Sequence, residues 1–228
     1  RSSGESGADF GDTLTYGGII ADNPGGSGRL VKTGTGTLRL ISNPNTFTGG
    51  LTVSGGLLSF SLENRLGAVP GVPTAGSIVL NGGGLPLTQN DVTLNSNRGI
   101  ALGPDTGSGN GVFNVDAGVS LTYNGILANN GSGSGALEKT EIGGLILGGA
   151  NTYSGGTTVT AGTLLVTNAA GSATGTGGVT TAAGTTLGGT GKIAPTGTNS
   201  VILGGSVAPG VAGSNNGRGA IIRCRLPT

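Results

Sequence analysis

The sequence of 228 residues has no histidine, methionine or tryptophan, one cysteine, 3% aromatic residues and 9% charged residues. Without histidine the chain lacks the commonest acid–base catalyst at neutral pH and the commonest metal ligand. A single cysteine excludes an internal disulfide and a zinc site built from several thiolates. We therefore predict no catalytic residues, no metal site and no cofactor, and expect that the chain is not an enzyme.

Charge and hydropathy exclude two further classes of partner. The formal net charge is +1 and the basic residues are scattered, so no footprint for nucleic acid is present. Arg218, Arg223 and Arg225 form the tightest basic group, which a solvated terminus explains better than a basic binding arm. No stretch approaches the roughly 18 consecutive apolar residues of a membrane helix, so we expect no membrane insertion by this segment. The scarcity of cysteine suits an exported bacterial surface protein.

Glycine (52 residues) and proline (9 residues) are abundant, at a level where disorder must be considered. The chain is nevertheless 34% hydrophobic with almost no net charge, whereas disordered chains combine low hydrophobicity with high net charge. Its apolar residues alternate with polar ones in short runs bounded by glycine, asparagine, aspartate or serine, a pattern that predicts half-buried strands. The clearest runs are residues 37–40, 51–53, 58–62, 92–94, 119–123 and 159–161. No helical stripe is present, so the predicted fold class is all-β.

Two glycine strings, residues 103–111 and 131–135, are expected to be loops between strands. They lack the Gly-Lys-Ser/Thr ending of a phosphate-binding loop. The Gly-Gly-x-Gly-x-Asp nonapeptides of a calcium-binding β-roll are also missing.

An internal repeat is the most informative feature of the sequence. Residues 32–40 align with residues 139–147 at an offset of 107, and residues 45–58 align with residues 151–164 at an offset of 106. Phe47 aligns with Tyr153, and the Gly-Gly pair at 49–50 recurs at 155–156. Such a unit of short strands and corners cannot bury its own inward side chains, but stacked units form a continuous narrow core. The repeat therefore predicts a β-solenoid.

Several residues have expected places in that solenoid. Asn45 and Asn151, beside a corner, are candidates for a side-chain amide ladder. The many threonines between residues 157 and 181 suit the outward side of strands. Five aromatic residues are expected to fill the core or stack at corners rather than to form a sugar-binding platform; they are Tyr16, Phe47, Phe60, Tyr123 and Tyr153.

Residues 139–165, and more loosely residues 32–58, resemble the passenger-associated transport repeat, also called the autotransporter-associated β-strand repeat. The second copy departs from that pattern chiefly at Glu141, and the first departs at Asn43, Pro44 and Leu51. The resemblance implies a right-handed parallel β-helix in a secreted or surface protein, where the repeat forms a stalk and carries no catalysis. We expect residues 1–29 to be an N-terminal cap or first partial coil, residues 30–210 the solenoid with repeats at 30–62 and 137–167, and residues 211–228 a divergent tail.

The leading functional hypothesis is a non-enzymatic, extracellular structural solenoid, a stalk or passenger segment at a bacterial surface. One alternative is a self-assembling filament or matrix subunit, joined end to end through residues 14–20 and 201–207. Another is an adhesin or glycan-binding module that contacts a glycan or host surface. A polysaccharide-cleaving enzyme would need paired carboxylates, and Asp105 and Asp116 are the likeliest such pair. Cys224 is expected to be a free thiol rather than an intermolecular disulfide.

Overall fold

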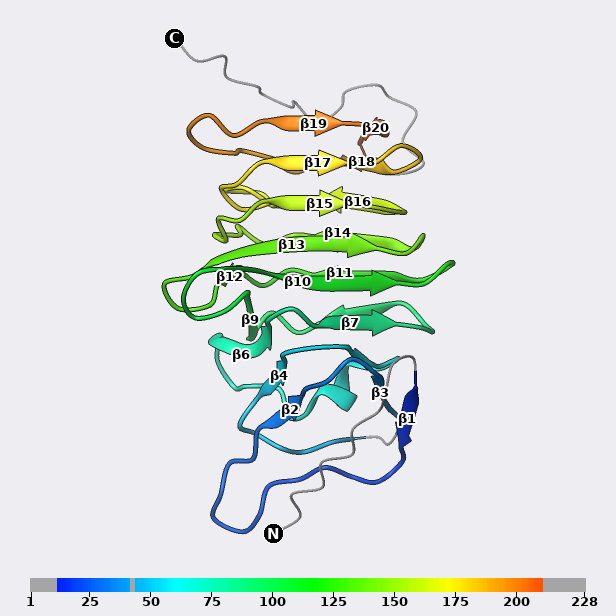
Figure 1. Cartoon of the computed structure of the whole chain (residues 1–228), viewed down its shortest axis with the longest axis vertical. Helices are drawn as coiled ribbons and strands as arrows, with labels where there is room; N and C mark the ends of the chain where they lie inside the picture. Colours follow the sequence, from blue (N-terminus) through cyan, green and yellow to red (C-terminus); the bar gives the residue numbers. More distant parts are fainter. Residues whose placement is uncertain (1–11, 42–43, 211–228) are drawn as a thin grey trace.

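In the computed structural model, which describes residues 12–41 and 44–210, the chain winds into a stack of parallel β-strands. The stack runs along the long axis of the molecule, from the N-terminal strands at one end to the C-terminal strands at the other (Figure 1). Three parallel sheets run along it, and the described residues contain no α-helix. The predicted fold class, an all-β parallel solenoid, is confirmed.

The largest sheet extends through the whole stack and has nine strands. Because it contributes one strand to each turn, the stack has about eight turns, each rising by roughly 4.8 Å. Its strands, in spatial order, are β1 (Thr13–Tyr16), β3 (Thr37–Leu40), β5 (Leu57–Ser59), β7 (Gly84–Leu87), β10 (Ser108–Val115), β13 (Ser134–Thr140), β15 (Thr157–Val159), β17 (Val179–Thr181) and β19 (Val201–Leu203).

The other two sheets each cover part of the stack, and they overlap in its middle. The five-stranded sheet occupies the N-terminal part, with β2 (Leu30–Lys32), β4 (Leu51–Val53), β6 (Thr74–Leu80), β9 (Arg98–Leu102) and β12 (Leu127–Asn129). The six-stranded sheet begins later, with β8 (Val92–Leu94), β11 (Ser120–Tyr123), β14 (Gly144–Leu147), β16 (Thr163–Val166), β18 (Thr186–Gly189) and β20 (Ser206–Pro209). A short 3-10 helix, η1 (Glu63–Leu66), follows β5. The middle turns therefore contain three strands, and the outer turns contain two.

Alternation of buried and more exposed side chains along many of the strands builds the core. In β14, Leu145 and Leu147 are buried while Gly144 and Ile146 are partly exposed. Parallel pairing in register then places the same type of side chain in successive turns next to each other, with Leu121 beside Leu145 and Leu145 beside Leu164. These inward side chains form one hydrophobic cluster from Leu40 to Ile193, which provides the main favourable free energy of folding.

Most predicted strands are present, with small shifts. Residues 37–40, 51–53 and 92–94 are strands with the predicted bounds, and the runs 58–62 and 119–123 are strands at 57–59 and 120–123. The run 159–161 is displaced, because its strand is Thr157–Val159. The threonines of this region are also not uniformly outward: Thr158 and Thr180 are exposed, whereas Thr157 and Thr181 point into the core.

The expectation that both glycine strings are loops is wrong for their second halves. Strand β10 begins at Ser108, strand β13 begins at Ser134, and Gly109 pairs with Gly135 between them. The reason is space: a Cβ on Gly111 would lie 2.6 Å from Cβ of Leu80 and 2.8 Å from Cδ2 of Leu102. Glycine here permits close approach of neighbouring turns rather than a change of direction.

Four of the five aromatic residues are in the core, as predicted. Phe47, Phe60, Tyr123 and Tyr153 are at most 2% exposed. The prediction is wrong for Tyr16, which is 40% exposed, because β1 is the terminal strand of its sheet and pairs only with β3 among the described residues.

The predicted domain boundaries stay predictions. Strand β1 already belongs to the nine-stranded sheet, which fits a first partial coil before residue 30. The tail at 211–228, with Cys224 and the three arginines, lies outside the described residues.

Candidate functional site

The repeated unit is longer than the alignment that first indicated it. At the same offset of 107, residues 13–40 align with residues 120–147, and 16 of these 28 positions are identical. The match of Thr-Leu-Thr-Tyr at 13–16 with Ser-Leu-Thr-Tyr at 120–123 is a signal in the sequence that the shorter alignment from the lysine onward does not include. The two copies reproduce the same polar contacts, which lie at the corners between strands.

The repeat lysine donates hydrogen bonds to the carbonyl oxygens of one corner. The Nζ atom of Lys139 donates hydrogen bonds to the carbonyl oxygens of Thr140 and Glu141, both at 2.6 Å, and to that of Ala161 in the next turn at 3.4 Å. Lys32 does the same in the first copy, with carbonyl acceptors in its own corner and in the next turn. Both side chains are buried, and burial lowers the pKa of both, that of Lys139 to about 8. Neither ammonium is accessible to a ligand, so their role is structural.

The repeat asparagine joins three successive turns. The Oδ1 atom of Asn151 accepts a hydrogen bond from the backbone N–H of Leu127 in the turn before, and Nδ2 donates to the carbonyl of Ala173 in the turn after. Asn45 makes the equivalent contacts, from Ile20 and to Arg65. The expected amide ladder, with asparagine stacked on asparagine, is therefore replaced by bonds to backbone groups. The neighbouring turns supply those groups, which would otherwise be buried without partners.

A second corner carries a cluster of short polar side chains on the surface. Asp22 accepts hydrogen bonds from the backbone N–H groups of Gly28 and Thr48 and from the Thr48 hydroxyl. These bonds, the Thr48 hydroxyl foremost, lower the pKa of the Asp22 carboxyl. Asn129 takes the place of Asp22 in the second copy, and its Oδ1 accepts from the backbone N–H groups of Gly135 and Ser154.

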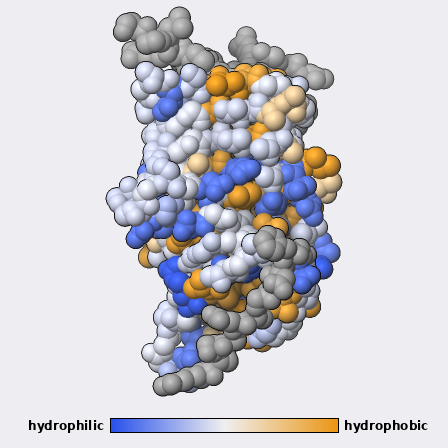
Figure 2. Space-filling model, viewed as in Figure 1, coloured by the Kyte–Doolittle hydropathy of each residue, from blue (hydrophilic) through white to orange (hydrophobic). Residues whose placement is uncertain are grey.

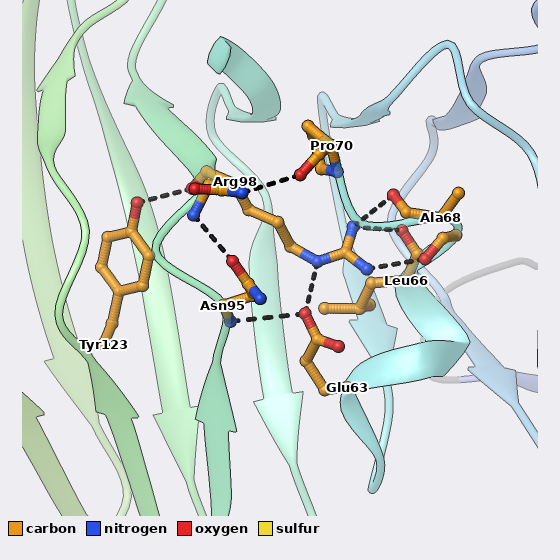
Figure 3. A network of polar contacts seen from close by, with 9 residues as sticks. Glu63, Leu66, Ala68, Pro70, Asn95, Arg98 and Tyr123 are labelled. Carbon is orange, nitrogen blue, oxygen red and sulfur yellow. Dashed lines mark hydrogen bonds and ion pairs between the residues drawn. The ribbon is translucent and has the colours of Figure 1, made fainter. Parts of the chain in front are cut away.

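Another buried charge belongs to a network between the two copies (Figure 3). Arg98 is 1% exposed; its Nε atom lies 2.6 Å from Oε1 of Glu63, and Nη1 and Nη2 donate to the carbonyls of Leu66, Gly67 and Ala68. The hydroxyl of Tyr123 donates to the Arg98 carbonyl at 2.5 Å. The network fixes η1 against β9 and leaves no polar atom of Arg98 for chemistry.

The two copies occupy different faces of the solenoid. Strand β3 of the first copy lies in the nine-stranded sheet, whereas its equivalent β14 lies in the six-stranded sheet. Likewise β2 lies in the five-stranded sheet and its equivalent in β13 lies in the nine-stranded sheet. The second copy of the motif therefore lies about four turns further along the stack than the first, on a neighbouring face of the solenoid.

The structure does not bring together Asp105 and Asp116, the two carboxylates considered as a pair. Asp105 precedes β10 and Asp116 follows it, so an eight-residue strand, roughly 26 Å long, separates the two carboxylates. In residues 12–41 and 44–210 no group of three or more histidine, cysteine, aspartate or glutamate side chains is placed to hold a metal ion. The same residues include no helix with the length and apolar character needed to span a membrane.

Comparison with known proteins matches two stretches of the sequence to a family model. Residues 30–60 and 137–166 match the family model described as passenger-associated-transport-repeat. The chain is 35% identical over 162 residues to the adhesin BmaC autotransporter of Brucella suis biovar 1 (strain 1330), covering 71% of this chain and 4% of that protein. It is 31% identical over 140 residues to the probable autotransporter YfaL of Escherichia coli (strain K12), covering 58% of this chain and 11% of that protein. No solved structure matches.

The chain carries two copies of the passenger-associated transport repeat, as predicted. Autotransporter passengers are secreted and displayed on the bacterial outer surface, so the predicted location agrees with that of the relatives. The chain spans only a small fraction of the length of either relative.

Proposed function

We propose that the chain is a non-enzymatic structural segment of a surface-displayed passenger, whose solenoid spaces and presents other parts of the protein. The observation that carries this proposal is the single hydrophobic cluster that runs through about eight turns. Three buried polar residues, Arg98, Lys139 and Asn151, join neighbouring turns. A rod of this kind provides length and stiffness, and it needs no reactive site for that role.

The proposal predicts that the rod can be lengthened in whole repeats. Because residues 58 and 164 are equivalent, a chain that runs from residue 1 to 164 and then continues from residue 59 to the end keeps every local junction. It gains 106 residues and about four turns, or roughly 20 Å. Small-angle scattering should show a maximum dimension longer by about that amount at an unchanged cross-section. A duplicated chain that unfolds, or that folds without becoming longer, contradicts the proposal.

A second candidate, end-to-end assembly into filaments, is favoured by apolar side chains exposed at both ends of the stack. Leu14 and Tyr16 on β1 are at least 40% exposed, and so are Ile202 and Leu203 on β19. Figure 2 shows hydrophobic surface gathered at the C-terminal end of the stack, at the level of β19. Electron microscopy of the purified chain tests this candidate: regular fibres that Ile202→Lys abolishes support it, and a chain that stays single at high concentration contradicts it.

A further inference from the structure

The first repeat differs from the second in one segment, which includes the start of strand β6. The backbone N–H of Ala68 donates to the Phe47 carbonyl just as that of Thr176 donates to the Tyr153 carbonyl. Further on, Ile78 and Val179 enter equivalent strand pairs. Nine residues lie between Ala68 and Ile78, but only two lie between Thr176 and Val179. The first copy therefore carries an insertion of seven residues, which includes the exposed Val72.

A second difference lies beside this insertion. The first copy has Arg29 where the second has Ala136. Both differences meet at one groove of about 370 Å³, within the roughly 300–1,000 Å³ range of ligand pockets. Its lining combines Arg29 and Thr48 from the repeat with Val69, Pro70, Thr74 and Ser77 from the segment with the insertion. The feature unique to the first copy is thus a groove with a cation at its edge.

Arg29 is exposed and has unused donors. Its Nη1 donates to the Thr52 hydroxyl at 2.7 Å, and no carboxylate among the described residues lies within ion-pair distance of it. The acid near the groove is Asp22, whose oxygens already accept hydrogen bonds from Gly28 and from the N–H and hydroxyl of Thr48. The N–H groups at Nε and Nη2 of Arg29 therefore remain for an incoming anion, and the fork of a guanidinium matches a carboxylate.

The rest of the lining indicates a ligand rich in hydroxyl groups. Thr48, Thr74 and Ser77 are short donors and acceptors, and glycine backbone lies between them. At Gly71 and Gly76 an added Cβ would meet nothing within 4 Å, so the backbone there faces open space. Val69 and Pro70 supply a small apolar surface, and no aromatic or long aliphatic side chain lines the groove for an apolar peptide side chain.

We propose that this groove is a carbohydrate-binding site that selects a sugar bearing a carboxylate, with Arg29 as the group that recognises the charge. This inference goes beyond the structural role proposed above and does not depend on it. It agrees with the printed name of one relative, an adhesin, whose matched segment covers 71% of this chain.

The test uses the full chain, trigalacturonic acid and its methyl ester, in which each carboxylate is replaced by an uncharged methyl ester group. Isothermal calorimetry at low salt should show binding of the acid and at least tenfold weaker binding of the ester. Arg29→Ala should remove the preference for the acid. Because the second copy folds with alanine at this position, this variant should keep its fold, as unfolding in urea will confirm. Replacing residues 69–77 with Gly-Gly, the pair at 177–178, should abolish binding of both sugars.

Lys192→Ala, a change at an exposed cation that is not among the groove residues, is the matched control and should bind like the unmodified chain. The proposal is overturned if neither sugar binds at millimolar concentration, if Arg29→Ala binds the acid as well as the unmodified chain, or if Lys192→Ala weakens binding equally. The last two results would assign any affinity to diffuse charge rather than to the groove.

Discussion

The Nε atom of Arg98 lies 2.6 Å from Oε1 of Glu63, which is 35 residues earlier in the chain and one turn away in the stack. Arg98 is 1% exposed, so its guanidinium places a positive charge in the core. Its charge is therefore held in the core by the Glu63 carboxylate and by the three carbonyls of residues 66–68. This pair connects the first repeat to the turns that follow it.

Glu63→Ala should destabilise the fold, because it leaves the guanidinium buried without its counter-charge. Removing one partner of a buried pair costs roughly 3–5 kcal/mol, and we expect about 3 kcal/mol here, since three carbonyl acceptors remain. Urea unfolding followed by circular dichroism measures the change. Asp105→Asn, at an exposed carboxylate, is the control and should have little effect. Equal midpoints for the two variants would show that the pair does not support the fold.

The stability of the chain should rise with pH between about 8 and 10.5. Burial lowers the pKa of Lys139 to about 8, whereas the unfolded chain keeps the ordinary value of 10.5. Within that window the unfolded state binds the proton that the folded state has released. The free energy of unfolding therefore increases with pH, by at most about 1.4 kcal/mol per pH unit for one proton. Below pH 8 both states are protonated and this contribution is constant.

Lys139→Met isolates that effect. The unfolding free energy of this variant should increase much less between pH 8 and 10.5 than that of the unmodified chain. A smaller rise should remain from Lys32, whose pKa is also lowered by burial. If the unmodified chain and Lys139→Met show the same pH dependence from 8 to 10.5, Lys139 is not the group responsible.

Asn151→Ala should destabilise the solenoid by about 2 kcal/mol, because it leaves the N–H of Leu127 and the carbonyl of Ala173 without their partner. Each buried unsatisfied group costs roughly 1–3 kcal/mol. Asn151→Asp keeps an oxygen for Leu127 but offers no donor to Ala173 while ionised, so thermal unfolding at neutral pH should also place it below the unmodified chain. If Asn151→Ala is as stable as the unmodified chain, water replaces both hydrogen bonds and the asparagine does not support the fold.

The repeat could be predicted from the sequence because the residues that define it are close together in the chain. The lysine, the asparagine and the Gly-Gly pair lie within one corner or one turn. Tyr16 shows where this reasoning stops. It follows the same Leu-Thr pair in sequence as Tyr123, yet it is exposed while Tyr123 is fully buried. Burial depends on whether another turn lies beneath the residue, and the motif does not contain that information.

The rotation of the second copy onto another face could not be predicted for a related reason. It depends on the three-stranded turns that begin at β6, and these arise from residues between the copies that follow no repeat. The groove was missed because Arg29, Thr48 and Pro70 are far apart in sequence and converge only when successive turns stack. Comparing the two copies for insertions, residue by residue, is the sequence signal that would have drawn attention to it.

Glu141 is a non-glycine residue with φ of 60°, at a corner where the first copy has Gly34 with φ of 71°. A side chain in this left-handed region costs roughly 1–2 kcal/mol, and the greater freedom of glycine in the unfolded chain offsets roughly 0.5–1 kcal/mol of the gain. Glu141→Gly should therefore stabilise the chain by about 0.5–1 kcal/mol, measured by urea unfolding.

The reciprocal change, Gly34→Glu, provides the matched comparison. An added Cβ on Gly34 would meet nothing within 4 Å, so the variant tests backbone conformation without a clash, and it should destabilise the chain by a similar amount. Because the Glu141 carboxylate also attracts the Lys139 ammonium, both variants should be compared at high salt, where that attraction is weakened. If Glu141→Gly is less stable than the unmodified chain at high salt, the corner gains more from contacts of the glutamate side chain than it loses to backbone strain.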